Sequence, residues 1–491
     1  MQPISRRRAL QLGGLGVASI AVAAAGLTWR TLSGYTTVAR QALVEPATLT
    51  STDGLLTLRL EAAEGPVRIA GRQATALSYN GGLPGPTLRL RPGDRLRVRL
   101  VNRLAEVTNL HVHGLHVSPE RNGDNPFVAV EPGSTFDYDY QLPPDHPSGM
   151  FWYHPHHHGM VADQIFGGLY GAIIVDKPAS EFSSIPITRE RVLVISDISL
   201  NASGSIRPPS AMARMRGREG DLVLVNGEFA PTMEAHPGER ERWRILNACT
   251  ARYLRLRLDG QRLSLLGIDS GHLVEPRDVE EILLIPGNRA DVLVTTVQLT
   301  SPLQALPYSR GAVMGMGGGM GSDPPSRSNA ESTTLAILHV TGDEATPLPP
   351  VTARTHQMDL RRGPLSARRE LTLAMGMGMG GGGMSFTIDG KKFASDRVDQ
   401  TVRSRTIEEW TITNTSPMDH PIHLHVWPMQ VIEEGGKLIE QPTWRDVVNV
   451  PARSNVKVRI LFDDFVGRSV YHCHILDHED QGMMGVIDVR R

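Results

Sequence analysis

The sequence predicts an all-β fold divided into several domains, and three observations support this. The chain has 491 residues, more than a single hydrophobic core usually serves, so two to four domains are expected. Its 49 glycines and 34 prolines punctuate short segments rich in Val, Leu, Ile and Thr, which is typical of strands joined by turns. Long amphipathic helical patterns are scarce. The formal net charge of −1 gives no support for binding to nucleic acid.

An internal repeat indicates three β-sandwich domains. An alternating segment that ends in Asn occurs at residues 92–102, 237–247 and 405–414, and the first two copies open on a Pro-Gly turn. The spacing of the copies suits one β-sandwich module each. We therefore expect domains over residues 45–178, 190–345 and 355–491.

Residues 1–27 lie outside the predicted β domains and look like a twin-arginine export signal. Three arginines at positions 6–8 precede an apolar run rich in Gly and Ala. Small-residue patterns at 21–23 and 23–25 both suit a signal peptidase. The alternative is a membrane anchor, although the run is short for spanning a bilayer. We expect the twin-arginine machinery to export the folded protein to the periplasm or beyond, and an uncleaved signal would tether it to the membrane.

Two histidine pairs lie in the first predicted domain. His111 and His113 lie in Asn-Leu-His-Val-His-Gly, and His154 and His156 lie in Trp-Tyr-His-Pro-His. Side chains two residues apart in a strand share a face and lie roughly 6–7 Å apart, which suits ligation of neighbouring metal ions. Two more histidines follow directly, so the second pair could instead be His156 and His158.

The third predicted domain contains two further clusters, and the second predicted domain contains none. The clusters are His420, His423 and His425, and the run His472-Cys473-His474 followed by His478 and Met483. Thiolate, imidazole and a weak thioether together form the ligand set of a blue-copper electron-transfer site. If 472–474 is extended, Cys473 points to one face and its two neighbours to the other, so one strand would serve two metal sites. Taken alone, this segment could also be a zinc site or a core cysteine.

The four clusters, in this order, resemble the copper motifs of the multicopper oxidases, the family of laccases and bacterial copper-resistance oxidases. The likeness extends from about residue 45 to the C-terminus, no ligand position is missing, and the family pattern favours the 154/156 register because that pair directly follows Trp-Tyr. The resemblance implies three cupredoxin domains and four copper ions. It assigns the type 1 copper to His420, Cys473, His478 and Met483, the type 2 copper to His111 and His423, one type 3 copper to His113, His154 and His474, and the other to His156, His425 and His472.

The resemblance also implies a mechanism. A small reductant gives electrons one at a time to the type 1 site, and Cys473 passes them to a three-copper cluster between the first and third domains, where dioxygen is reduced to water. The second domain would be a spacer without copper. Protons must come from carboxylates, because copper-bound imidazoles cannot titrate freely. Glu479 and Asp124 resemble the acidic relay positions of the family, and the alternative for each is an ordinary exposed loop carboxylate.

Two segments that alternate Met and Gly concern the reductant. They contain Met314, Met316 and Met320 late in the second domain, and Met375, Met377, Met379 and Met384 at the start of the third. Thioethers are soft ligands that prefer cuprous ion, and glycine lets the backbone arrange them freely. Similar insertions mark the bacterial metallo-oxidases of the family, although those usually also carry His. The alternative is a pair of mobile loops in which Met is incidental.

We therefore expect an exported, monomeric multicopper oxidase that couples oxidation of a reductant to reduction of dioxygen. Cuprous ion is the favoured reductant, which implies a role in copper homeostasis, and phenolic compounds are the alternative. A non-catalytic cupredoxin-fold envelope protein would have lost ligands, and a copper nitrite reductase would need no three-copper cluster. The chain has two cysteines, so Cys249 has no disulfide partner and is expected to be a small buried hydrophobe.

Overall fold

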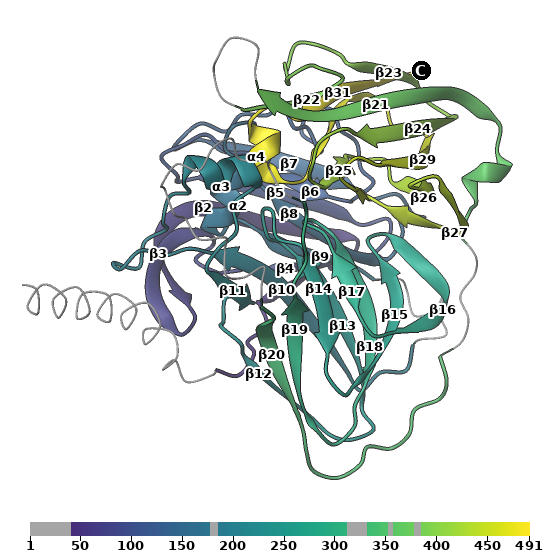
Figure 1. Cartoon of the computed structure of the whole chain (residues 1–491). Coiled ribbons are helices and arrows are strands. Elements are labelled where there is room, and N and C mark those ends of the chain that lie inside the picture. The colour runs from purple at the N-terminus through teal and green to yellow at the C-terminus, as the bar shows by residue number, and fades with distance from the viewer. Residues whose placement is uncertain (1–40, 177–184, 312–330, 352–356, 378–383) are drawn as a thin grey trace, which may run out of the picture. The chain divides into compact units, whose positions relative to one another are not determined.

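The computed structural model describes residues 41–176, 185–311, 331–351, 357–377 and 384–491. The predicted export signal and the methionines at positions 314, 316, 320 and 379 lie outside these residues. The described strands form six sheets, and the described helices are short (Figure 1), which confirms the all-β prediction. No helix in this part of the chain is both long and apolar enough to cross a membrane.

The first two sheets use strands from residues 48–175, and one apolar core joins them. In the strand at 95–102 arginines alternate with buried apolar residues, which is the pattern of a sheet with one face on the core. One sheet has the order β3 (Arg72–Tyr79), β2 (Leu55–Ile69), β5 (Arg95–Asn102) and β7 (Thr135–Gln141). The other has the order β1 (Thr48–Thr50), β4 (Thr87–Leu90), β9 (Gly171–Val175), β8 (Gly149–His154) and β6 (His111–His113), and helix α2 (Val161–Gly167) precedes β9.

The next two sheets use strands from residues 189–340 and enclose a second core around Trp243. One has the order β11 (Leu222–Val225), β10 (Arg189–Ile198), β13 (Arg240–Asn247), β18 (Arg289–Thr295), β15 (Arg262–Ile268) and β16 (Gly271–Val279). The other has the order β12 (Thr232–Ala235), β20 (Thr333–Val340), β19 (Thr300–Leu306), β14 (Leu254–Leu258) and β17 (Ile282–Leu284). Helix α3 (Ala211–Arg216) lies between β10 and β11 in the chain, and the hydroxyl of Ser210 caps its N-terminus.

The last two sheets use strands from residues 365–490 around a third core. One has the order β22 (Met384–Ile388), β21 (Leu365–Met377), β24 (Thr406–Asn414), β29 (Asn455–Phe462), β26 (Met429–Glu434) and β27 (Lys437–Arg445). The other has the order β23 (Gln400–Arg403), β31 (Met484–Arg490), β30 (Gly467–Cys473), β25 (His420–Leu424) and β28 (Val447–Val450). The 3-10 turn η2 (Leu360–Arg362) and helix α4 (Leu476–Asp480) complete this part.

We call the three sheet pairs the first, second and third domain. The three copies of the sequence repeat become β5, β13 and β24, and each occupies the same place in its sheet. Each lies parallel to the strand before it in the sheet (β2, β10 or β21) and antiparallel to the strand after it (β7, β18 or β29). The domain boundaries at 45–178, 190–345 and 355–491 stay a prediction.

The hydrogen bonds of the asparagine that ends each repeat explain why this residue recurs. The side chains of Asn102, Asn247 and Asn414 are buried, and each amide nitrogen donates to at least two backbone carbonyls. Each amide oxygen accepts from the backbone N–H two residues later. The repeated Asn therefore satisfies the backbone where the chain leaves the strand.

Candidate metal centre

Strand pairing brings the four clusters together. In the first domain β6 lies antiparallel to β8, with His111 opposite His154. In the third domain β25 lies antiparallel to β30, with His423 opposite His472 and Ile422 opposite Cys473. The register of each pair therefore places the histidines of one cluster beside those of the next.

The prediction that both histidines of every pair lie in a strand is wrong for two pairs. His156 lies beyond the end of β8, and His425 lies beyond the end of β25. In the run 472–474, β30 ends at Cys473, so His474 also lies outside its strand. Pro155, which has no N–H for the ladder, separates His154 from His156 and ends the strand. After His425 the backbone turns, since Val426 has a positive φ of 70°.

His420, Cys473 and His478 form what we call the cysteine site. The Cys473 Sγ lies 3.4 Å from Nδ1 of His420 and 3.9 Å from Nδ1 of His478, and these two nitrogens are 3.4 Å apart. All three residues are fully buried. The backbone N–H of Ile475 points at Sγ from 3.4 Å. One thiol and two imidazole nitrogens thus converge on one point.

Hydrogen bonds at the far side of each imidazole orient the ligands of the cysteine site. The Nε2–H of His420 donates to the hydroxyl of Ser416 at 2.8 Å. The Nε2–H of His478 donates to the carbonyl of Met215, at the end of α3, at 3.1 Å. Both bonds leave Nδ1 unprotonated and facing Cys473, which is the state a metal ligand needs. Burial lowers the pKa of His420 to about 3, which also keeps that ring neutral.

Met483, expected as the axial ligand, lies beside this site. It is fully buried in the same apolar core as Cys473. Its N–H donates to the carbonyl of His478 at 2.9 Å, and its carbonyl accepts from the N–H of Cys473 at 3.0 Å. The backbone therefore ties Met483 to two residues of the cysteine site.

The remaining eight histidines of the four motifs form the histidine cluster: His111, His113, His154, His156, His423, His425, His472 and His474. Its first group is the pair assigned to a type 2 ion, in which Nε2 of His111 lies 3.4 Å from Nε2 of His423. The Nδ1–H of His111 donates to Asp124 at 2.8 Å, and the Nδ1–H of His423 donates to the carbonyl of Asp446 at 2.7 Å. Both bonds leave Nε2 available for a metal.

His156, His425 and His472 form the second group. Their three Nε2 atoms are 3.0 to 3.2 Å apart. The Nδ1–H of His472 donates to the carbonyl of Cys473 at 3.1 Å, so its Nε2 carries a lone pair. His472 of this group directly precedes Cys473 of the cysteine site in the chain.

His113, His154 and His474 form the third group. Nδ1 of His113 lies 3.4 Å from Nε2 of His154, whose own Nδ1–H donates to the carbonyl of Pro155. The ring of His474 lies 5.1 Å from that of His113 and 6.1 Å from that of His154, centroid to centroid. Among the residues that the structure describes, neither nitrogen of His474 has a hydrogen-bond partner, although His474 is fully buried.

These groups fit metal ions and fit little else. Burial lowers the pKa of each of these histidines, so the rings are neutral and lone pairs face lone pairs at short range. Buried polar atoms without a partner are costly, and a cation between them removes that cost. Imidazole groups with a single thiolate site suit copper. The assignment of individual histidines to individual ions stays a proposal.

The two carboxylates expected as a proton relay are buried, so the alternative of an exposed loop carboxylate is wrong for both. Asp124 accepts from His111 and lies 3.7 Å from Nδ1 of His425, and burial raises its pKa to about 8. Glu479 lies 3.0 Å from Nδ1 of His472 and 3.4 Å from Nε2 of His156, and burial raises its pKa to about 7. Both therefore lie where a proton could be held beside the histidine cluster. Their role in proton transfer stays a prediction.

Sequence reasoning missed the residues that orient the ligands. Ser416, Met215 and Asp446 accept the hydrogen bonds described above, and Arg289 pairs with Asp446. Except for Ser416, four residues before His420, they are far in sequence from the residue that they contact. No local pattern could have indicated them.

The described methionines of the two Met-Gly segments are Met375, Met377 and Met384, and they lie in the third domain. Met375 and Met384 are partly buried and pack against the core that contains Cys473. Met377 ends β21 and pairs with Met384 across the hairpin. Cys249 is buried and unpaired, as expected.

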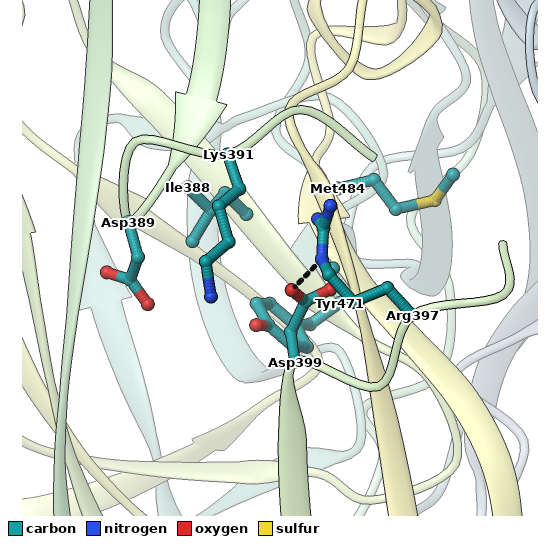
Figure 2. A pocket seen from close by; sticks show the side chains of 8 residues that line it. Ile388, Asp389, Lys391, Arg397, Asp399, Tyr471 and Met484 are labelled. Carbon is teal, nitrogen blue, oxygen red and sulfur yellow. Dashed lines mark hydrogen bonds and ion pairs between the residues drawn. The ribbon is translucent and has the colours of Figure 1, made fainter. Parts of the chain in front are cut away.

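A small polar pocket lies near the strands that carry the ligands (Figure 2). Its lining residues are Ile388, Asp389, Lys391, Arg397, Asp399, Tyr471, Met484 and Gly485. Arg397 donates to Asp399 at 2.7 Å beside Tyr471. The lining contains no residue of the cysteine site or the histidine cluster, so it is not part of the metal centre.

Comparisons with known proteins agree with this geometry. Models described as multicopper oxidase match residues 61–180, 196–303 and 367–491. A multicopper oxidase of Staphylococcus aureus is 28% identical over 89% of this chain and 90% of its own length. A laccase of Bacillus subtilis is 26% identical over 84% and 89%. The structure of a multicopper oxidase of Campylobacter jejuni, described as a metallo-oxidase, superposes with a TM-score of 0.81 at 29% identity, over 92% of this chain and 96% of that one.

Matches to the same family over all three domains, together with a thiol–imidazole site joined to a buried cluster of eight histidines, identify the chain as a member of the multicopper oxidase family, an oxidoreductase that uses four copper ions and dioxygen.

Proposed function

We propose that cuprous ion is the physiological reductant of this multicopper oxidase, and that phenolic compounds are secondary substrates. The observation that carries the proposal is that two methionine-bearing elements, α3 and the β21–β22 hairpin, contact the imidazole of His478. Relatives of both kinds exist, since one similar protein is named a laccase and another is described as a metallo-oxidase.

The bound copper ions supply one-electron oxidation of the reductant and four-electron reduction of dioxygen to water. The protein provides the path between the two sites. Cys473 is bonded through the backbone to His472 and His474, so an electron that enters the cysteine site has a short covalent route to the histidine cluster. Burial of the cluster excludes bulk water.

Helix α3 covers the cysteine site from the second domain. The carbonyl of Met215 accepts from Nε2 of His478, the ring nitrogen that faces away from Cys473. Met215 packs against the core that contains Cys473, and Met212, three residues earlier on α3, is 42% exposed. The helix thus presents one partly buried methionine side chain to the core of the cysteine site and one exposed methionine side chain to solvent.

The β21–β22 hairpin contacts the same imidazole. The ring of Phe386 stacks on that of His478, with centroids 4.3 Å apart. Met375 lies opposite Phe386 in the ladder, and Met384 precedes Phe386 by two residues. Both methionines pack on the core of the cysteine site.

The last described residues before the first Met-Gly segment lie close to His420. Gly311, the last described residue before it, forms a bridge with Met418, two residues before His420. The backbone N–H of Asp419 donates to the carbonyl of Arg310 at 2.7 Å. Since His420 and His478 are both fully buried, a large organic reductant has no direct contact with either ring. A small soft cation held by thioethers suits this arrangement better.

The proposal is tested by replacing Met212, Met215, Met375 and Met384 together with Leu, which keeps apolar bulk and removes the thioethers. We expect KM for cuprous ion to rise about tenfold or more, as for loss of metal-orienting groups elsewhere. Oxidation of a phenol should hold steady, because its electron needs no thioether. Steady-state rates at controlled free copper measure both.

Met358→Leu is the matched control, because Met358 is 64% exposed and belongs to neither α3 nor the hairpin. It should change neither the KM for cuprous ion nor the rate of phenol oxidation. Equal losses on copper and phenol in the fourfold variant would mean that the methionines are structural. In that case phenolic compounds would become the preferred assignment.

We also propose that residues 1–27 direct export through the twin-arginine machinery. The basis is the sequence alone: arginines at positions 6–8 followed by a short apolar run. Replacing Arg6, Arg7 and Arg8 with Lys should retain the protein in the cytoplasm, as judged by cell fractionation. Unchanged export would contradict the assignment.

A further inference from the structure

The second domain reaches the histidine cluster through the loop that enters β18. Gly287 lies in this loop with a φ of +86°. A Cβ added there would lie 2.9 Å from Nε2 of His474 and 3.2 Å from Cε1 of His113. The backbone of the second domain therefore passes so close to His113 and His474 that no side chain fits between, which is not expected of a pure spacer.

Arg289, two residues later, connects the second domain to both others. Its guanidinium donates two parallel hydrogen bonds, each 2.6 Å long, to the carboxylate of Asp446 in the third domain. Its Nε donates to the carbonyl of Met150 on β8 of the first domain at 2.8 Å. Arg289 is 1% exposed and Asp446 is 2% exposed, so the pair is shielded from water.

Asp446 in turn contacts two ligands with two different groups. Its carboxylate accepts from Nε2 of His113 at 3.0 Å, which leaves Nδ1 of His113 facing His154. Its main-chain carbonyl accepts from Nδ1 of His423 at 2.7 Å, which leaves Nε2 facing His111. One residue thereby sets the ligand nitrogen of two imidazoles assigned to different copper ions.

Further bonds hold the pair in place. Asp269 of the second domain accepts from the backbone N–H of Arg289 at 3.0 Å and from that of Asp446 at 3.3 Å. Asn288 donates to Asp269 and to the carbonyl of Val447. A fork between arginine and carboxylate that is fixed at both backbones has little freedom to rotate.

We propose that Arg289 is a positioning residue for the three-copper cluster: through Asp446, it holds His113 and His423 in the tautomers and orientations that present Nδ1 and Nε2 to copper. The second domain then takes part in assembling the catalytic centre, although none of its described side chains is among the histidine ligands. Arg289 does not touch the reacting atoms.

The test uses the holoenzyme with Arg289→Lys, Arg289→Met and Asp446→Asn. Lysine keeps the charge but cannot form the two-bond fork, and asparagine keeps the shape but weakens the pair. We expect affinity for the type 2 and type 3 copper ions to fall about 10- to 100-fold. Copper content should drop below four ions per chain, and the EPR spectrum of the type 2 copper should change. The blue band and the rate of type 1 reduction should stay as in the wild type.

Arg244→Lys is the matched control. Arg244 is also 2% exposed and pairs with Glu190 and with Asp176 across the first and second domains, but contacts no histidine of the cluster. It should keep all four copper ions and the wild-type EPR spectrum.

A second measurement needs no copper. In the copper-free protein with 15N-labelled histidine rings, the wild type should show His113 protonated at Nε2, and Arg289→Lys should show a mixture of tautomers. Full copper content with an unchanged type 2 EPR spectrum in both Arg289 variants would overturn the proposal. So would a parallel loss of the blue band, which would indicate a general structural role.

Discussion

In the proposed electron path, Cys473 connects the cysteine site to the histidine cluster. Burial raises the pKa of the Cys473 thiol, so without a metal it stays protonated. A copper ion offsets that burial because it binds the thiolate, and binding releases the proton. The Ile475 N–H that points at Sγ stabilises the same charge.

Cys473→Ser should therefore remove the intense blue band and the oxidase activity while leaving the fold intact. Visible absorption and oxygen consumption measure these effects, and circular dichroism checks the fold. Cys249→Ala is the matched control, since Cys249 is the other buried cysteine and should leave the colour unchanged. A blue Cys473→Ser protein would contradict the site.

Glu479 is the residue whose position best suits proton supply. It is fully buried, neither carboxylate oxygen has a hydrogen-bond partner in the described structure, and His472 lies 3.0 Å away. Glu479→Gln keeps the shape but cannot give up a proton at neutral pH. Reoxidation by oxygen should slow about 100-fold, whereas type 1 reduction should stay fast. If rapid mixing shows unchanged reoxidation, Glu479 is not the donor.

At the residue scale the sequence could locate the histidine clusters, because ligand spacing is a local property of a strand. It could also indicate Asp124 and Glu479, since each lies near a histidine in the chain. It could not indicate Asp446 or Arg289, because their contacts depend on how three domains pack. Met215 orients His478 through its main-chain carbonyl, and a main-chain contact cannot be read from a pattern of side chains.

At the element scale, α3 is held against the cysteine site by close packing at its C-terminus. Gly217 follows the helix with a φ of +79°, and a Cβ added there would lie 2.5 Å from Cγ2 of Ile475 and 2.8 Å from Cβ of Ala251. Only glycine permits both this backbone conformation and this contact.

Gly217→Ala should move α3 away from α4 and uncover His478. The overpacking should lower the free energy of unfolding by about 1–3 kcal/mol, as measured by denaturant titration. Oxidation of bulky phenols should speed up, because His478 becomes accessible. Gly133→Ala is the control for backbone strain, since Gly133 has a φ of +76° with no atom near its added Cβ. Equal effects of both changes would mean that α3 packing is not responsible.

The strands themselves were predictable from alternation and from the repeat, because both follow from one buried face. The exact ends were not. His156 lies outside β8 because Pro155 ends the strand, and His425 lies outside β25 because the backbone turns at Val426. The exact residue at which each strand ends depends on how the adjacent segments of the chain fold.

At the scale of the whole molecule, buried arginines connect the domains. Arg218 of the second domain donates to Asp477 on α4 at 2.6 Å and also pairs with Asp163 on α2. Arg218 and Asp477 are both 2% exposed. The sequence-based view of the second domain as a spacer is therefore incomplete, since Arg218 and Arg289 each contact both other domains.

Arg218→Met should leave Asp477 buried and unpaired, which should lower the free energy of unfolding by about 3–5 kcal/mol. Thermal unfolding of the copper-loaded protein measures the effect. Arg207→Met is the control, because Arg207 and Asp221 form a pair with more than half of each side chain exposed, and should cost less than about 1 kcal/mol. Similar losses of unfolding free energy in the two variants would show that the buried pair contributes no more to stability than the exposed pair.

Cuprous ion is the proposed source of electrons for this enzyme. The most direct measurement is a steady-state comparison of cuprous ion, ferrous ion and a phenol as reductants of the wild-type holoenzyme, at controlled free copper. We expect the highest kcat/KM for cuprous ion, because α3 and the β21–β22 hairpin both contact His478 and both carry methionines, while the imidazoles of His420 and His478 are closed to larger molecules. A higher kcat/KM for the phenol would contradict the account and make the protein a laccase with organic substrates.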